Sequence, residues 1–209
     1  MRNTSSTRTE RCWELGDSAG RSNARPRSGA ARTSSLGGVA ADRIFVLEEG
    51  RKFSFSFEDM LRYHGGGSPG GVAHAFKVLE RGLPLLEVGG GVERRELLIE
   101  TAFGGPGARD AFELVTRAVT GERFNLDPAL MLPQLGRARE RFVFRLRRRD
   151  RAVTLILRPG FVTDEFVELT SRDLRSADDE RQLAAMKSDM ATRVMSAAAA
   201  AVYDVAPVS

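Results

Sequence analysis

Cysteine and long apolar runs are scarce in this chain of 209 residues. Its single cysteine excludes an intrachain disulfide framework and a structural zinc site built from cysteines. No run of 18 apolar residues occurs, so the sequence predicts no membrane-spanning helix and favours a cytoplasmic protein. With 42% hydrophobic and 29% charged residues, the chain has enough apolar material for one globular domain without disulfides.

The basic residues are concentrated in one segment. The formal net charge is +4, and residues 1–41 hold seven arginines against three acids, so the rest of the chain is balanced. This segment is rich in Ser, Thr, Gly, Ala and Arg, and it has no apolar periodicity. We therefore predict a disordered basic tail at 1–41 and one folded domain at 42–209. The net positive charge of the chain therefore says nothing about a partner of the folded domain.

Helical and extended patterns alternate after residue 42. Ser56 and Asp59 have the spacing of a capping box, which predicts a two-turn helix that ends before a glycine-rich loop. A second helix is expected at 72–81, with Gly82 as its C-terminal cap. The remaining expected elements are an extended segment at 44–57, a strand at 97–100, a helix at 111–118, a hairpin of strands at 141–147 and 152–158, and a helix from 177 to about 202.

These elements predict an α+β fold, with helices packed on a mostly antiparallel or mixed sheet and a long C-terminal helix. Met186 and Met190 lie on one face of that last helix, which indicates core packing or a dimer seam. Five arginines around the turn of the predicted hairpin form a basic cluster, but no aromatic residues are interleaved with them. The sequence therefore does not favour a nucleic-acid partner there.

The glycine-rich loop at 65–71 precedes a helix, and free backbone N–H groups at a helix start bind anions. A phosphate-binding loop is therefore one alternative. The loop does not match G-x-x-x-x-G-K-[ST], and no strand precedes it as the G-x-G-x-x-G motif requires.

Several segments are similar, in order, to the motifs of one known protein family. Residues 56–71, SFEDMLRYHGGGSPGG, are similar to a motif that runs F-E-D, an aromatic residue, then H-G-H-x-C-P-G. Residues 109–116, RDAFELVT, are similar to C-x-x-D-A-I-Q-x-L-T-G-C. Three shorter similarities follow in the family's order, at 135–144, 194–197 and 202–205. Together these segments resemble the FmdE family, which takes its name from a component of formylmethanofuran dehydrogenase. The resemblance covers roughly residues 43–206.

The resemblance implies a metal site built from histidines and cysteines, which are ligands for zinc or iron. In this chain His64 matches the first histidine and Asp110 matches the aspartate, whereas Ser68 stands at a cysteine position. The other ligand positions of the family hold Gly66, Gly107 and Ala118. No zinc ribbon follows the last similar segment. The chain is therefore expected to have weakened or lost metal chemistry.

The resemblance predicts a ligand-binding site of His64, Ser68 and Asp110, with His64 and Asp110 as metal ligands. Each residue also has a structural interpretation. A histidine at a helix C-terminus complements the helix dipole, and so does an aspartate near a helix N-terminus. Ser68 is a poor nucleophile without an adjacent base.

Three functions follow, and the sequence favours a non-catalytic domain over an enzyme. The first is an FmdE-like accessory domain that binds a small molecule or a metal and forms a homodimer. The second is a zinc-dependent enzyme, in which His64 and Asp110, with His74 or Glu113, hold a zinc that activates water. The third is an anion or nucleic-acid binder that uses the glycine loop and the arginine tail. The cofactor is unknown, with zinc or iron as the candidates.

Overall fold

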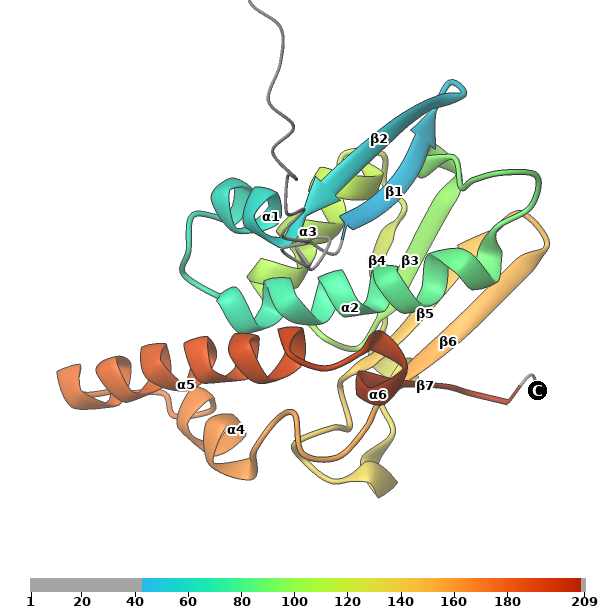
Figure 1. Cartoon of the computed structure of the whole chain (residues 1–209). Coiled ribbons are helices and arrows are strands. Elements are labelled where there is room, and N and C mark those ends of the chain that lie inside the picture. Colours follow the sequence, from blue (N-terminus) through green and yellow to red (C-terminus); the bar gives the residue numbers. More distant parts are fainter. Residues whose placement is uncertain (1–42, 208–209) are drawn as a thin grey trace, which may run out of the picture. The chain divides into compact units, whose positions relative to one another are not determined.

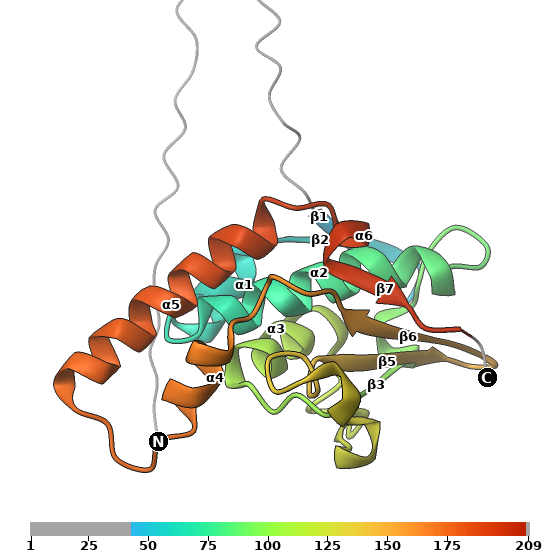
Figure 2. The same ribbon diagram turned by 90° about the horizontal axis from the view of Figure 1, so that it is seen from below.

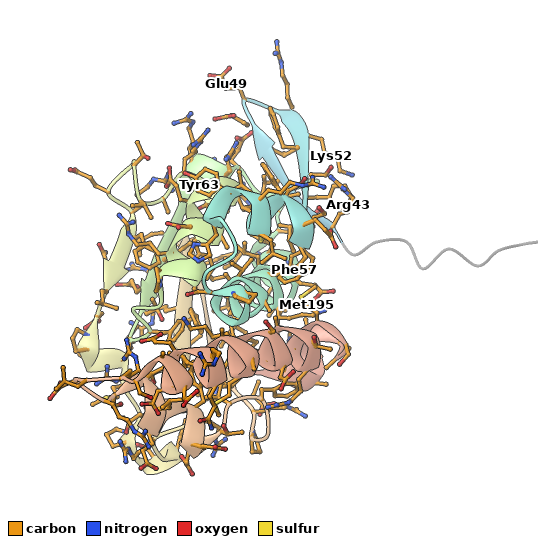
Figure 3. The ribbon with its side chains drawn as sticks, turned by 90° about the vertical axis from the view of Figure 1, so that its left-hand side faces the viewer. Arg43, Glu49, Lys52, Phe57, Tyr63 and Met195 are labelled. Carbon is orange, nitrogen blue, oxygen red and sulfur yellow. The ribbon has the colours of Figure 1, made fainter. Side chains whose placement is uncertain are left out.

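A β-hairpin opens the part of the chain that this computed structural model describes, residues 43–207. Its strands β1 (Arg43–Glu48) and β2 (Arg51–Ser56) pair antiparallel. Glu49 and Gly50 form the turn, both at positive φ, and Glu49 marks the tip of the hairpin (Figure 3). Two residues at positive φ suit a tight hairpin because their backbone matches the twist of the strands. The sequence predicted one extended segment here, and the turn divides it in two.

The main sheet has five strands in the order β4-β3-β5-β6-β7. They are β3 (Leu97–Thr101), β4 (Phe124–Leu126), β5 (Val143–Arg148), β6 (Arg151–Leu157) and β7 (Tyr203–Val205). β3 and β4 are parallel, and every other neighbouring pair is antiparallel. The predicted α+β fold with a mixed sheet is thus confirmed. The predicted hairpin is β5 and β6, joined at Arg149 and Asp150.

Six α-helices lie within the described residues. They are α1 (Phe57–His64), α2 (Pro69–Leu86), α3 (Pro106–Thr116), α4 (Asp164–Thr170), α5 (Ala177–Met195) and α6 (Ala199–Val202). Short 3-10 helices occur at Arg94–Glu96, Pro128–Leu130 and Pro133–Leu135. α2 runs across the sheet, and α5 lies along α2 (Figure 1). The core lies between these helices and the sheet, with Phe76, Phe144 and Leu155 fully buried.

The start of α1 follows the predicted capping box. The Ser56 hydroxyl accepts a hydrogen bond from Asp59 N–H at 3.1 Å, and the Asp59 carboxylate accepts one from Ser56 N–H at 2.9 Å. The helix ends at His64, because Gly65 adopts a left-handed conformation with φ 84°. This conformation costs little in glycine and satisfies the last carbonyls of the helix.

α2 is longer than the sequence predicted, since it starts at Pro69 and continues through Gly82 to Leu86. Gly82 is not a helix cap. A Cβ atom at this position would lie 2.4 Å from Cδ1 of Leu146, so the glycine lets the helix approach β5 closely. The predicted helix end at Gly82 was therefore wrong, because a packing contact has the same sequence signal as a cap.

The predicted C-terminal helix is long, but it is interrupted. α5 ends at Met195, and residues 196–198 separate it from the short α6. β7 then follows directly and pairs with β6, and Ala206 N–H donates to the Thr154 carbonyl at 2.8 Å. The interruption turns the chain from the helical layer back to the sheet.

The predicted disordered tail at 1–41 lies outside the described residues, so it stays a prediction, as does the domain boundary at 42. All described residues belong to one compact unit. None of the helices in residues 43–207 is long and apolar enough to cross a membrane.

Candidate functional site

His64 and Asp110 meet between the end of α1 and the start of α3. Nδ1 of His64 lies 2.8 Å from Oδ2 of Asp110, a contact between residues 46 positions apart. The His64 side chain is 9% exposed and the Asp110 side chain 32%. Tyr63, the neighbour of His64 on α1, lies at the surface (Figure 3). The structure thus brings together two of the three residues that the sequence predicted as a ligand-binding site.

The hydrogen bond assigns different roles to the two imidazole nitrogens of His64. An ionised carboxylate only accepts hydrogen bonds, so Asp110 accepts from Nδ1–H and leaves a lone pair on Nε2 of the neutral ring. Nε2 is buried and has no hydrogen-bond partner among the described residues. A buried nitrogen without a partner costs free energy, which a ligand donor at Nε2 would offset.

The backbone of the glycine-rich loop passes close to this nitrogen. A Cβ atom on Gly67 would lie 4.0 Å from Nε2 of His64. Gly65 and Gly66 both have positive φ, so the chain turns sharply between α1 and α2 at residues that L side chains disfavour. The loop therefore approaches His64 with backbone alone.

Ser68 lies on the other side of this loop, where the starts of α2 and α3 meet. A Cβ atom on Gly107 would lie 2.4 Å from the Ser68 carbonyl oxygen and 3.0 Å from Ser68 Cβ. A Cβ on Gly71 would lie 3.1 Å from Ala108 N. The two helix starts therefore touch through backbone atoms. No side chain, and hence no cysteine, fits at position 107 without a shift of the backbone.

The other family cysteine position is remote from the pair. Ala118 lies beyond the C-terminal end of α3, whereas Asp110 lies in its first half. Asp110 and the last residue of α3, Thr116, are six residues apart, which corresponds to about 9 Å along the helix. Ala118 is fully buried, and its carbonyl accepts from Arg123 N–H at 2.7 Å.

The two further ligands considered for a zinc site have other partners. Nδ1 of His74 lies 2.8 Å from Oη of Tyr203, and both residues are fully buried. Burial lowers the pKa of His74 to about 3 and raises that of Tyr203 well above its ordinary value. Glu113 accepts hydrogen bonds from Val119 and Thr120 after the end of α3. Both side chains are therefore engaged in other contacts, and neither forms a hydrogen bond with His64 among the described residues.

The donor set does not fit a metal ion. Within residues 43–207, no group of three or more His, Cys, Asp or Glu side chains could hold one. Oδ2 of Asp110 accepts the hydrogen bond from Nδ1 of His64. The carboxylate is therefore placed to orient the ring, as carboxylates that contact metal-bound histidines do in many metal sites, and not to bind the same ion as the ring. One imidazole nitrogen remains, which is fewer than the three protein ligands of a typical catalytic zinc.

A cavity of about 320 Å³, here called the interhelix cavity, adjoins Ser68. Its lining includes residues from the starts of α2 and α3 and from α4 and α5. Figure 2 shows how these four helices are arranged. The cavity lining includes Phe103, Phe142, Phe166, Arg175 and Lys187, but neither His64 nor Asp110. The structure therefore places Ser68 at a different space from the other two predicted residues.

The predicted basic cluster at the β5–β6 turn is largely paired with acids. Arg148 and Arg149 both donate to the Glu96 carboxylate, at 2.9 and 2.5 Å. Arg147 lies 3.9 Å from Glu100. These contacts compensate part of the positive charge at the turn.

Comparison with known proteins adds no family. No protein-family model matches the chain, and no curated protein matches it at a significant level. The resemblance to the FmdE family therefore rests on the motifs alone. Sequence reasoning missed the roles of Lys187, Phe103 and Tyr203, because a single lysine or aromatic residue in an amphipathic pattern carries no signal of a cavity or of a buried hydrogen bond.

Proposed function

We propose that this chain is an FmdE-like domain that binds a small molecule at His64 and has lost the metal chemistry of the family. The observation that carries the proposal is the pair itself: Asp110 orients the imidazole, and the buried Nε2 has no partner among the described residues. In this arrangement His64 contacts the ligand by accepting a hydrogen bond, and Asp110 is a positioning residue.

Two observations support the loss of metal chemistry: position 107 has no space for a side chain, and few metal ligands lie near His64. A thiol at position 107 would collide with the Ser68 carbonyl, and no second soft ligand is present near His64 within the described residues. A single imidazole binds zinc weakly, because affinity grows with the number of preorganised ligands.

We also propose a cytoplasmic location and a homodimer. The absence of a membrane-crossing helix among the described residues is compatible with the location. Met190 is buried in the core and Met195 packs against it, whereas Met186 is half-buried on α5. Light scattering at two protein concentrations tests the dimer, and a mass equal to one chain would contradict it.

The metal part of the proposal is tested by elemental analysis of the full chain, purified without a histidine tag. We expect zinc and iron well below one equivalent, and added Zn²⁺ should bind the parent protein no more tightly than it binds His64→Gln. Stoichiometric zinc that disappears in His64→Gln would contradict the proposal and support the zinc site instead.

The ligand part is tested with a library of small neutral hydrogen-bond donors, screened by ligand-observed NMR. We expect binders that are lost in His64→Gln and retained in Arg62→Gln, a matched change on the exposed face of α1. If every binder of the parent protein also binds His64→Gln, or if none binds either protein, His64 is not the ligand contact.

A further inference from the structure

The interhelix cavity has an apolar and aromatic wall. Phe103 and Phe142 are stacked, with ring centroids 4.3 Å apart and an interplanar angle of 25°. Phe166, Leu183 and Met190 complete this part of the lining. Ligand cavities in proteins span about 300–1,000 Å³ and are mostly apolar. A space of about 320 Å³ therefore suits a small molecule of one or two rings.

The charge of the lining has one sign. Lys187 and Arg175 are its only charged residues, and no aspartate or glutamate belongs to it. Arg175 donates to Glu180 at 2.6 Å, so its charge is largely compensated. Lys187 donates to the Gly67 carbonyl at 3.2 Å and forms no salt bridge with an acid in residues 43–207. The ammonium group of Lys187, whose hydrogen bond to Gly67 is exposed, thus lacks a counter-ion in the described part of the chain.

Two helix starts add to this positive potential. The N-cap residues of α2 and α3, Ser68 and Gly105, both line the cavity; the Ser68 side chain makes no capping hydrogen bond, and Gly105 has no side chain to make one. Each helix begins with a proline, so its N–H donors start at the second residue. The first N–H groups of a helix carry partial positive charge and need an acceptor. An anion near Lys187 would supply an acceptor for these groups and a counter-ion for the lysine.

We propose that the interhelix cavity binds a small aromatic carboxylate. Its carboxylate lies at Lys187 and the start of α2, and its ring system lies against Phe103, Phe166 and Leu183. The inference goes beyond the proposed function, because neither His64 nor Asp110 lines this cavity.

The first experiment uses 2-naphthoate as the probe and isothermal titration calorimetry on the full chain. We expect 2-naphthoate to bind at least about tenfold more tightly than 2-naphthamide, which has nearly the same shape and no charge. A tenfold ratio corresponds to about 1.4 kcal/mol. Equal affinities, or no binding of either compound, would overturn the proposal.

Two lysine variants test whether the Lys187 ammonium group binds the carboxylate of 2-naphthoate. Lys187→Met should weaken 2-naphthoate about tenfold and leave 2-naphthamide unchanged. Lys52→Met removes the same charge from the β1–β2 hairpin, outside the cavity lining, and should change neither affinity. Thermal unfolding confirms that both variants fold. A similar loss in both variants would show a non-specific charge effect and refute the assigned site.

A third variant separates this site from the one proposed at His64. Binding of 2-naphthoate should be the same in His64→Gln and in the parent protein. If His64→Gln abolishes it, the anion occupies the His64 site, and the interhelix cavity proposal fails while the proposed function stands. A different outcome is that binding of the neutral hydrogen-bond donors does not depend on His64, while Lys187→Met weakens 2-naphthoate and Lys52→Met does not. In that case the proposed function fails and the cavity proposal stands.

Discussion

Nδ1 of His74 and Oη of Tyr203 form a fully buried hydrogen bond of 2.8 Å between residues 129 positions apart. It ties α2, near the start of the domain, to β7 at its end. Phe142 lies against the same imidazole, with ring centroids 4.8 Å apart. His74 is therefore a structural histidine of the core.

This histidine predicts how stability depends on pH. Burial lowers the pKa of His74 from 6.5 to about 3, so between these values the unfolded chain binds a proton that the folded chain does not. Stability is therefore full above about pH 6.5 and falls as the pH drops toward 3, by up to about 1.4 kcal/mol per pH unit for one proton. Urea unfolding at several pH values measures this slope.

The matched variant for this measurement is His74→Gln, which cannot titrate. Its absolute stability will be lower, because the substitution perturbs a packed core, but its slope between about pH 6.5 and 4 should be shallower than that of the parent protein. Equal slopes in the two proteins would assign the acid sensitivity to other groups.

Tyr203→Phe removes one partner of the buried hydrogen bond and leaves both nitrogens of His74 unpaired. An unsatisfied buried polar group costs about 1–3 kcal/mol, so we expect a loss of that size in the free energy of unfolding. Tyr63→Phe, at a tyrosine that is 48% exposed, is the control and should change stability by less than about 0.5 kcal/mol. Comparable losses in both variants would contradict the role assigned to Tyr203.

Gly107→Ala tests the close approach of α2 and α3. Alanine is favoured over glycine within a helix by about 1 kcal/mol. The new Cβ would lie 2.4 Å from the Ser68 carbonyl oxygen, and overpacking against backbone costs about 1–3 kcal/mol or more. We expect the steric clash to outweigh the gain in helix propensity, with a net loss of about 1–2 kcal/mol in the free energy of unfolding, measured by chemical denaturation.

Gly104→Ala is the matched change, because its Cβ would meet Leu126 at an ordinary contact distance of 3.6 Å. Its effect on stability should stay within about 0.5 kcal/mol. A neutral or stabilising effect of Gly107→Ala would mean that the helix starts separate easily. Position 107 could then accept a cysteine.

Asp110→Asn tests the orientation of the His64 ring. With the carboxylate present, the neutral imidazole should carry its proton on Nδ1, and ¹⁵N NMR distinguishes this tautomer from the Nε2–H form. An amide can donate as well as accept, so the variant should populate both tautomers. Arg109→Gln changes the neighbouring charge, 3.9 Å from Asp110, and should leave the tautomer unchanged. A parent protein with its proton on Nε2 would contradict the assigned roles.

Features formed by residues close together in the sequence could be predicted, whereas contacts between distant segments could not. The capping box of Ser56 and Asp59 was predicted because all its partners lie within four residues. Gly82 was misinterpreted because its reason, the approach to Leu146, comes from a strand more than 60 residues away. The short elements β4, β7, α4 and α6 were missed, since three to seven residues carry too little periodicity.

The candidate site shows the same division. His64 and Asp110 were chosen from motifs, but their 2.8 Å contact depends on how α1 packs against α3. Ser68 was grouped with them because it stands at a cysteine position of the resembled motif, and the structure places it at the interhelix cavity. Lys187 on α5 contacts Gly67 of the glycine-rich loop, 120 residues away, and no local sequence pattern predicts such a contact.

β7 protects a strand that would otherwise invite self-association. β6 has the sequence Arg-Ala-Val-Thr-Leu-Ile-Leu, and a strand of this kind with unpaired N–H and C=O groups readily joins the edge of another sheet. Three residues provide the cover, anchored from within by Tyr203 and at the surface by an Arg158–Asp204 ion pair of 2.8 Å. Proteolytic loss of this short C-terminal segment would therefore expose the aggregation-prone edge at Leu155–Leu157 and also remove the core partner of His74.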